Sequence, residues 1–304
     1  MSECRNCGRS VLQDIGPIGR VEPFFLKRVF GMELRAATST SPLKQMIRNL
    51  AELPMPFLSR VHSLYSFVEL QVCLHCSFIQ TKIPFHEEDI IRLYVDYREP
   101  SYVRERIQYE PAYATIAAAV GQGEVEIRTR TTALNAFLRS ALPSTDSLTM
   151  LDYGGSDGRF MPNLPGAKFI YEVSKLDPLP GITRINSESE LGTYSMVLLA
   201  HVTEHVVHPL NLVRKLRSYV EPGGYLYIET PQDITDQQRN GLLQGTLKMQ
   251  IGIHEHINYY CVSAVSGLLE SAGFAVAAIE CTPADLGWAK SAHIRALGRK
   301  DSAQ

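Results

Sequence analysis

Short apolar segments alternate with helical stretches between residues 148 and 280, and this alternation constrains the fold more than any other feature of the chain. Strands that are separated by helices run in the same direction, and the resulting sheet is usually covered by helices on both faces. We therefore expect an α/β fold with a Rossmann-like, mostly parallel sheet. The expected strands cover residues 148–153, 168–173, 195–200, 225–230 and 274–279.

The length of 304 residues is comfortable for two domains. We assign residues 1–105 to a small N-terminal domain, residues 106–145 to a helical linker and residues 146–304 to the domain with the parallel sheet. Pro143 predicts the end of a helix over residues 124–142.

Three smaller segments have their own patterns. Residues 67–72 alternate between apolar and polar side chains, which predicts a strand. Residues 27–60 are rich in Lys and Arg and contain several prolines, so we interpret them as an insertion. The basic residues could contact an anionic substrate or could simply form a solvated face. The tail after Lys290 reads as short and polar.

Charge and hydropathy argue against several classes of protein. Thirty Lys and Arg balance 32 Asp and Glu, so the net charge is −2. A chain with this balance has no overall positive potential to attract the phosphates of a nucleic acid. No apolar run approaches the roughly 20 residues that cross a bilayer, and the first residues lack the apolar core of a signal peptide. We expect a cytoplasmic protein that binds neither nucleic acid nor membranes.

Four of the six cysteines form two CxxC pairs, Cys4 with Cys7 and Cys73 with Cys76. In a reducing compartment, two such CxxC segments, which we call knuckles, indicate a tetrahedral zinc site rather than disulfide bonds. A site with four thiolates has no open position, so the zinc would be structural. The alternative is four ordinary buried or redox-active cysteines.

A glycine-rich loop follows the first expected strand of the parallel sheet. Asp152 ends that strand, and Gly154, Gly155, Ser156 and Gly158 precede an expected helix start. Glycines let a ligand approach the backbone, and a helix N-terminus offers unpaired amides. The spacing differs from the GxGxxG pattern of dinucleotide loops. A carboxylate at Asp152 would repel a pyrophosphate but would suit a cationic ligand.

The next expected strand carries Glu172, twenty residues beyond Asp152. An acid at this position can accept hydrogen bonds from both hydroxyls of a ribose. S-adenosylmethionine combines a ribose with amino and sulfonium cations, so it is the ligand that best fits both features. The alternative is a glycine-rich turn with a purely structural role.

Residues 148–280 resemble a class I S-adenosylmethionine-dependent methyltransferase. The matching segments are 151–158 (LDYGGSDG), 171–174 (YEVS), 199–205 (LAHVTEH) with Pro209, and 221–231 (EPGGYLYIETP). The resemblance implies that Asp152, the loop glycines, Ser156 and Glu172 bind the cofactor. It also implies that His201 and Glu204 lie beside the cofactor.

A narrower resemblance covers most of the chain. The double CxxC domain, the DxGxxxG loop with its Asp157–Gly158 pair, and the HEHINY sequence at residues 254–259 are similar to sugar C-methyltransferases. Those enzymes usually carry a further C-terminal domain and a Tyr where this chain has Ile253. The resemblance implies a small sugar-like acceptor, and it implies that His256 removes a proton beside a ketone while Glu255 and His254 assist.

Histidine suits that role because its imidazole titrates near neutral pH. The resulting enolate carbon would take the methyl group from the sulfonium. O-methylation of a hydroxyl could use the same histidine, and a cofactor-binding scaffold without chemistry is the third hypothesis. A purely structural role for the His-Glu-His sequence also stays open. Tyr94 or Tyr97 could orient the acceptor, and Trp288 is expected to pack against other residues. His201, His205 and His208 have spacings that suggest a metal site, but we favour a structural or cofactor-lining role for them.

Overall fold

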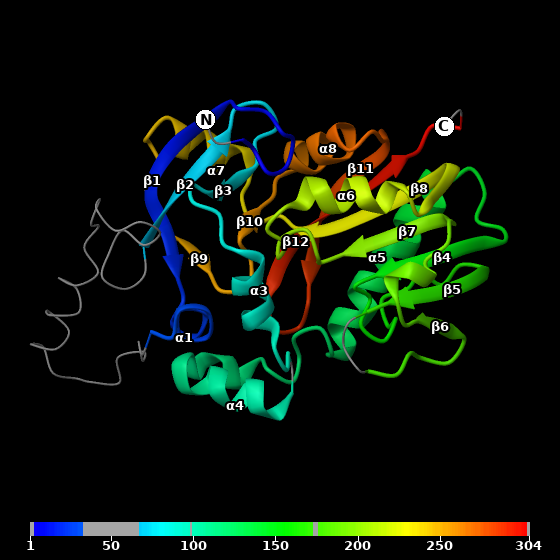
Figure 1. Ribbon diagram of the computed structural model, residues 1–304, viewed down its shortest axis with the longest axis horizontal. Helices are drawn as coiled ribbons and strands as arrows, with labels where there is room; N and C mark the ends of the chain where they lie inside the picture. Colours follow the sequence, from blue (N-terminus) through cyan, green and yellow to red (C-terminus); the bar gives the residue numbers. More distant parts are fainter. Residues whose placement is uncertain (1–2, 33–66, 98, 173–175, 303–304) are drawn as a thin grey trace, which may run out of the picture.

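The computed structural model describes residues 3–32, 67–97, 99–172 and 176–302. These residues form two β-sheets that lie side by side, with the N-terminal strands in one sheet and most of the strands after residue 148 in the other (Figure 1). We call the five-stranded sheet, with the order β10-β3-β2-β1-β9, sheet A. The seven-stranded sheet, with the order β11-β12-β8-β7-β4-β5-β6, is sheet B.

Sheet B is the predicted mostly parallel sheet. Its first five strands in chain order pair in parallel with one another, and β12 pairs antiparallel with both β8 and β11. The strands are β4 (Leu148–Tyr153), β5 (Gly166–Tyr171), β6 (Ile182–Ile185), β7 (Tyr194–Ala200), β8 (Val220–Pro231), β11 (Ala275–Asp285) and β12 (Lys290–Arg299). The sequence analysis did not anticipate β6, which is short and only half-buried.

Helices cover both faces of sheet B because its strands are apolar on both sides. Val197 and Leu199 of β7 pack in the cluster that contains the apolar residues of α6 (Pro209–Arg217) and α8 (Val262–Ser271). Met196 and Leu198, which alternate with them, pack against α5 (Glu124–Ala141) on the opposite face. The α5 helix confirms the prediction for residues 124–142.

Sheet A combines strands from two distant parts of the chain. Its strands are β1 (Leu12–Val21), β2 (Phe67–Cys73), β3 (Ile79–Thr81), β9 (Ile251–Ile253) and β10 (Asn258–Tyr259). β9 pairs in parallel with β1, and β10 pairs antiparallel with β3. The segment around His254, Glu255 and His256 therefore connects the two edges of sheet A.

Four short helices and two 3₁₀ turns complete the described residues. The helices α1 (Pro23–Phe30), α3 (Glu87–Tyr94) and α4 (Pro100–Tyr109) contribute apolar side chains to one cluster with sheet A. The helix α7 (Asp236–Leu243) follows β8, and the 3₁₀ turns cover Pro111–Thr115 and Glu188–Glu190. None of the described helices is long and apolar enough to span a membrane.

One expectation about the chain is wrong. The tail after Lys290 forms β12, whose Ile294, Ala296 and Leu297 are fully buried. The insertion expected at residues 27–60 stays a prediction, and its first residues, 27–30, belong to α1. The part of that insertion from residue 33 to residue 60 lies outside the described residues. The strand expected at residues 67–72 is confirmed as β2.

Candidate active site

The glycine-rich loop folds back on the carboxylate that precedes it. Asp152 is 2% exposed, and a Cβ atom added to Gly155 would lie 2.4 Å from its Oδ2 atom. The backbone N–H of Gly154 donates to the carbonyl of Tyr171 at the end of β5. A side chain at position 155 would clash with the buried Asp152 carboxylate, and glycine also lets a ligand approach the backbone of the loop.

The helix expected after this loop is absent from the described residues between β4 and β5. Residues 156–165 form turns and coil instead, and Pro162 and Pro165 disfavour a helix there. Asp157 forms an ion pair with Arg159, with Oδ2 and Nη2 2.6 Å apart. The loop therefore offers turn amides rather than a helix N-terminus.

Glu172 lies directly beside the loop, as its position in the sequence predicted. Its Oε2 atom accepts a hydrogen bond of 3.0 Å from the backbone N–H of Ser156. Burial raises the pKa of Asp152 to about 7, and the charges of Glu172 and Glu229 act in the same direction while Arg130 opposes them. Burial and the two nearby acids thus destabilise the ionised form of Asp152 more than Arg130 stabilises it. A positively charged group placed beside this carboxylate would therefore be favoured.

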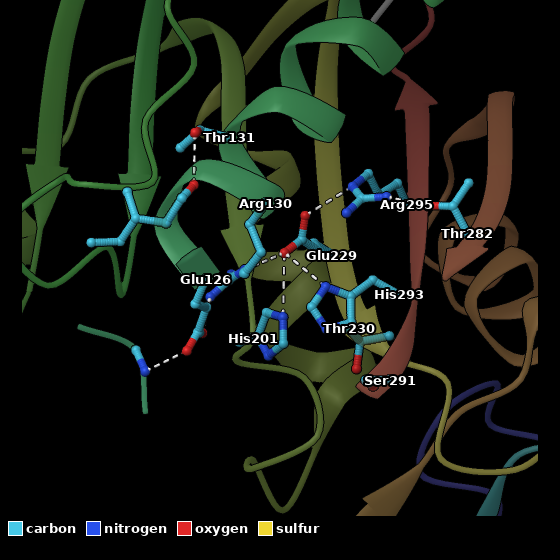
Figure 2. A network of polar contacts seen from close by, with 12 residues as sticks. Glu126, Arg130, Thr131, His201, Glu229, Thr230, Thr282, Ser291, His293 and Arg295 are labelled. Carbon is cyan, nitrogen blue, oxygen red and sulfur yellow. Dashed lines mark hydrogen bonds and ion pairs between the residues drawn. The ribbon is translucent and has the colours of Figure 1, made fainter. Parts of the chain in front are cut away.

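Beyond the loop lies a buried ionic network centred on Glu229 of β8 (Figure 2). The side chain of Arg130 donates to Oε1 at 2.8 Å, and Arg295 donates to Oε2 at 3.1 Å. The hydroxyl of Tyr227 donates to Oε2 at 2.7 Å. Burial alone would raise the pKa of Glu229, but Arg130, His201 and Arg295 hold it well below its usual range.

His201 joins this network to the loop after β7. Its Nε2 atom is 3.3 Å from Glu229, and its Nδ1 atom is 3.2 Å from Glu204. The residue has a φ of 55°, a left-handed conformation that is uncommon outside glycine. Burial and Arg130 lower the pKa of His201, but the two carboxylates outweigh them and raise it. His201 therefore bridges two buried acids.

Glu204 is fully buried and connects the loop after β7 to the His-Glu-His segment. Thr230 donates to its Oε2 atom at 3.1 Å, and its carbonyl accepts hydrogen bonds from the backbone of Ile257 and Asn258. Burial would raise the pKa of its carboxyl, but His201 and His205 lower it. The ring of His205 lies 5.0 Å from that of His256.

The three residues of the His-Glu-His segment have different environments. His254 accepts a hydrogen bond at Nδ1 from the backbone N–H of Glu255, and burial lowers its pKa to about 3. Burial would raise the pKa of Glu255, but Arg106 and the neighbouring histidines lower it to about 2. Burial lowers the pKa of His256, yet Asp233 outweighs it and raises the value to about 9.

Helices α3 and α4 supply an aromatic and cationic wall to this segment. Arg106 forms an ion pair with Glu255, and the hydroxyl of Tyr102 donates to the same carboxylate at 3.2 Å. Tyr97 donates to it at 3.5 Å, and the hydroxyl of Tyr94 lies 2.7 Å from Nδ1 of His205. The structure thus places both expected tyrosines beside the His-Glu-His segment.

The four paired cysteines converge in a separate place. The Sγ atoms of Cys4 and Cys76 are 3.7 Å apart, those of Cys7 and Cys73 are 3.6 Å apart, and all four lie within 4.8 Å of one another. Four thiolates at about 2.3 Å from a zinc ion, at the corners of a tetrahedron, would be about 3.8 Å apart. The spacing therefore fits a structural zinc ion.

The histidine spacing that suggested a metal site does not produce one group. His201 clusters with Glu229 and His293, whereas His205 clusters with Glu204 and His256. His208 belongs to neither of the candidate metal groups found among the described residues. Trp288 is half-buried and donates from its indole nitrogen to Glu126 at 2.7 Å.

Several residues of the site were missed from sequence. Glu229, Arg130, Arg295 and His293 form the network in Figure 2, and Asp233 contacts His256. A charged residue inside an apolar strand was the available signal for Glu229 and Arg295, since such residues are rarely buried without partners. No signal in the sequence linked Asp233 to His256.

The chain was compared with known proteins in three ways. A family model described as a methyltransferase domain matches residues 126–279. No curated protein matches the chain. Similar solved structures include an S-adenosylmethionine-dependent methyltransferase from Mesorhizobium loti, with 15% identity, a TM-score of 0.39 and coverage of 54% of this chain and 96% of that one. Another is a 1,6-didemethyltoxoflavin-N1-methyltransferase from Burkholderia thailandensis, with 12% identity, a TM-score of 0.47 and coverage of 80% and 100%.

Proposed function

Because the chain belongs to the methyltransferase domain family, we propose that it transfers a methyl group from S-adenosylmethionine to a carbon atom of a nucleotide-linked keto-sugar. The observation that carries this proposal is the contact between the His-Glu-His segment and the loop after β7. The Nδ1 atom of His205 lies 3.0 Å from the carbonyl oxygen of Glu255, and Asn258, two residues after His256, donates from its side chain to the carbonyls of Thr203 and Val206 at 2.9 and 2.6 Å. These contacts support a single site for the candidate base and the candidate cofactor-lining residues.

The residues around the glycine-rich loop suit the cofactor. When bound, S-adenosylmethionine supplies an electrophilic methyl group on a positively charged sulfur. Asp152 would favour that positive charge, because among the described residues Arg130 is the group that stabilises its negative charge while Glu172 and Glu229 oppose it. Glu172 would accept hydrogen bonds from the ribose hydroxyls. Gly154, Gly155, Ser156 and Gly158 would line the pocket, with His201 and Glu204 on its other side.

The His-Glu-His segment would carry the proton chemistry. His256 would remove the proton next to the ketone in its neutral form, which predominates above its raised pKa of about 9, and the ionised Glu255 would favour the resulting imidazolium. His254 is neutral, and its Nδ1 atom already accepts a hydrogen bond, so its Nε2–H would donate to the enolate oxygen. The acceptor would approach the wall formed by Tyr94, Tyr97 and Arg106.

The cysteine cluster would hold a structural zinc ion. Cys4, Cys7, Cys73 and Cys76 are all buried, and they belong to the apolar cluster that also contains α6 and α8. The bound ion would therefore tie the N-terminal knuckles to one face of sheet B. It would take no part in the transfer, because four thiolates leave no open coordination position.

Two measurements test the proposal. Calorimetry on the folded protein should show binding of S-adenosylmethionine and of S-adenosylhomocysteine. With a panel of nucleotide-linked keto-sugars in deuterated water, the hydrogen beside the ketone should exchange, and a carbon-methylated product should form. His256→Ala should stop both reactions while cofactor binding persists. An oxygen-methylated product would favour the hydroxyl alternative, and cofactor binding without turnover of any acceptor would favour a scaffold.

A further inference from the structure

Asp233 contacts the proposed base although it belongs to none of the motifs. It follows β8 in the chain, and its Oδ1 atom lies 3.0 Å from Nδ1 of His256. Both side chains are largely buried, at 17% and 19% exposure. The Oδ2 atom of Asp233 is buried and has no hydrogen-bond partner among the described residues.

This contact decides which nitrogen of His256 can react. An ionised carboxylate only accepts hydrogen bonds, so Nδ1 of His256 must carry its hydrogen toward Asp233. In the neutral ring, Nε2 is then the atom with the lone pair. Among the residues that the structure describes, none forms a hydrogen bond with Nε2.

The other charged and titratable groups near His256 do not perform this task. Glu204 and His205 approach from the loop after β7, and His254 and Glu255 belong to the same segment. Glu204 is paired with His201, and Glu255 is paired with Arg106. Among the described residues, Asp233 is the group that hydrogen-bonds to the His256 ring, and it lies on a different segment, between β8 and α7.

We infer that Asp233 is a positioning residue that fixes the tautomer and the orientation of His256, so that Nε2 faces the acceptor. The inference rests on the proposed function. In the step concerned, Nε2 takes the proton from the carbon next to the ketone. The electron pair of the C–H bond forms the enolate, whose negative charge rests on the ketone oxygen. The imidazolium that results is stabilised by the carboxylate of Asp233.

The Asp233→Asn variant tests the role, because an amide can donate to Nδ1 and thereby select the opposite tautomer. We expect kcat with the keto-sugar panel to fall by about 10²–10⁴-fold, while the Kd of the cofactor stays the same. Asp233→Glu should recover part of the lost rate. Asp236→Asn is the matched control, because this nearby carboxylate is exposed and pairs with Arg239. It should keep kcat within about twofold.

A readout without acceptor separates positioning from folding. In ¹⁵N-labelled full-length protein at a pH above the His256 pKa of about 9, where the ring is neutral, the His256 resonances should show hydrogen on Nδ1 in the wild type and on Nε2 in Asp233→Asn. The midpoint of the His256 titration should also fall in the variant. An unchanged tautomer, or an unchanged rate and pH profile, would overturn the inference.

The outcomes also distinguish this inference from the proposed function. If the wild type forms no carbon-methylated product, the proposed function fails, whereas the tautomer measurement still reports on the Asp233 contact. Glu204, His205 and His256 each offer one ligand atom within 4.8 Å of the others. Activity that a chelator abolishes and an added divalent cation restores, with zinc still in the cysteine cluster, would make His256 a ligand and overturn the inference.

Discussion

Cofactor binding should depend on pH through Asp152. This carboxyl is 2% exposed, and burial together with Glu172 and Glu229 raises its pKa to about 7 from a reference of 3.8. The free protein therefore holds Asp152 protonated at pH 6. A ligand that brings positive charge to the carboxylate favours its ionised form, so binding should release a proton.

The size of the effect follows from the pKa of Asp152, which is raised by about three units. This shift corresponds to about 4 kcal/mol between the protonated and the ionised form of its carboxyl group. If bound cofactor returns the pKa to about 4, affinity is nearly constant above pH 8 and falls by about tenfold per pH unit below pH 7. Because the pKa of Asp152 is raised, protons compete with the cation of the ligand, and binding therefore weakens as the pH falls. The Kd should thus increase by about 50-fold between pH 7 and pH 5.

Calorimetry at pH 5 to 8, in buffers with different ionisation enthalpies, measures both the Kd and the number of protons released. Asp152→Asn should remove the pH dependence and the proton release. Asp177→Asn is the control, because Asp177 is an exposed carboxylate on the segment that follows β5. An affinity of the wild type that does not change over this pH range would refute the reasoning.

Three further results are expected. The purified protein should contain one zinc ion per chain. Cys73→Ser should abolish zinc binding and lower the Tm, because the cysteines belong to the same apolar cluster as α6 and α8. A wild-type protein whose Tm does not change when the metal is removed would contradict this. Gly155→Ala should cost about 1–3 kcal/mol of stability and weaken cofactor binding, since the added Cβ meets the Asp152 carboxylate; urea unfolding and calorimetry measure both effects. Arg106→Met should leave Glu255 buried without its charged partner and destabilise the fold by about 3–5 kcal/mol, and an unchanged unfolding midpoint would count against the pairing.

The sequence predicted the features that depend on local patterns. Five of the seven strands of sheet B, the helix α5 and the position of Glu172 after the second expected strand all follow from short apolar runs or from fixed spacing along the chain. The cysteine cluster was predicted from two pairs of knuckles whose residues are far apart in sequence. Its identity as a zinc site stays a prediction.

The features that were missed depend on contacts between distant residues. One helix and two strands supply the three charged residues Arg130, Glu229 and Arg295. In the sequence, each of them is an isolated charged residue within an amphipathic or apolar stretch. The strand β12 was mistaken for a polar tail because the acidic partners of its Arg295, Glu229 and Glu280, come together with it only in the folded protein. The contact of Asp233 with His256 is of the same kind. The roles assigned to His254, Glu255 and His256 stay predictions.

The intertwined make-up of sheet A has a consequence for biosynthesis and for engineering. β1 and β2 leave the ribosome early, yet their sheet gains β9 and β10 only when residues 251–259 have been made. The N-terminal knuckles therefore wait for most of the chain before their sheet is complete. A chimera that exchanged this part at a single junction would inherit a sheet without its two outer strands, so a working graft needs both segments from the same parent.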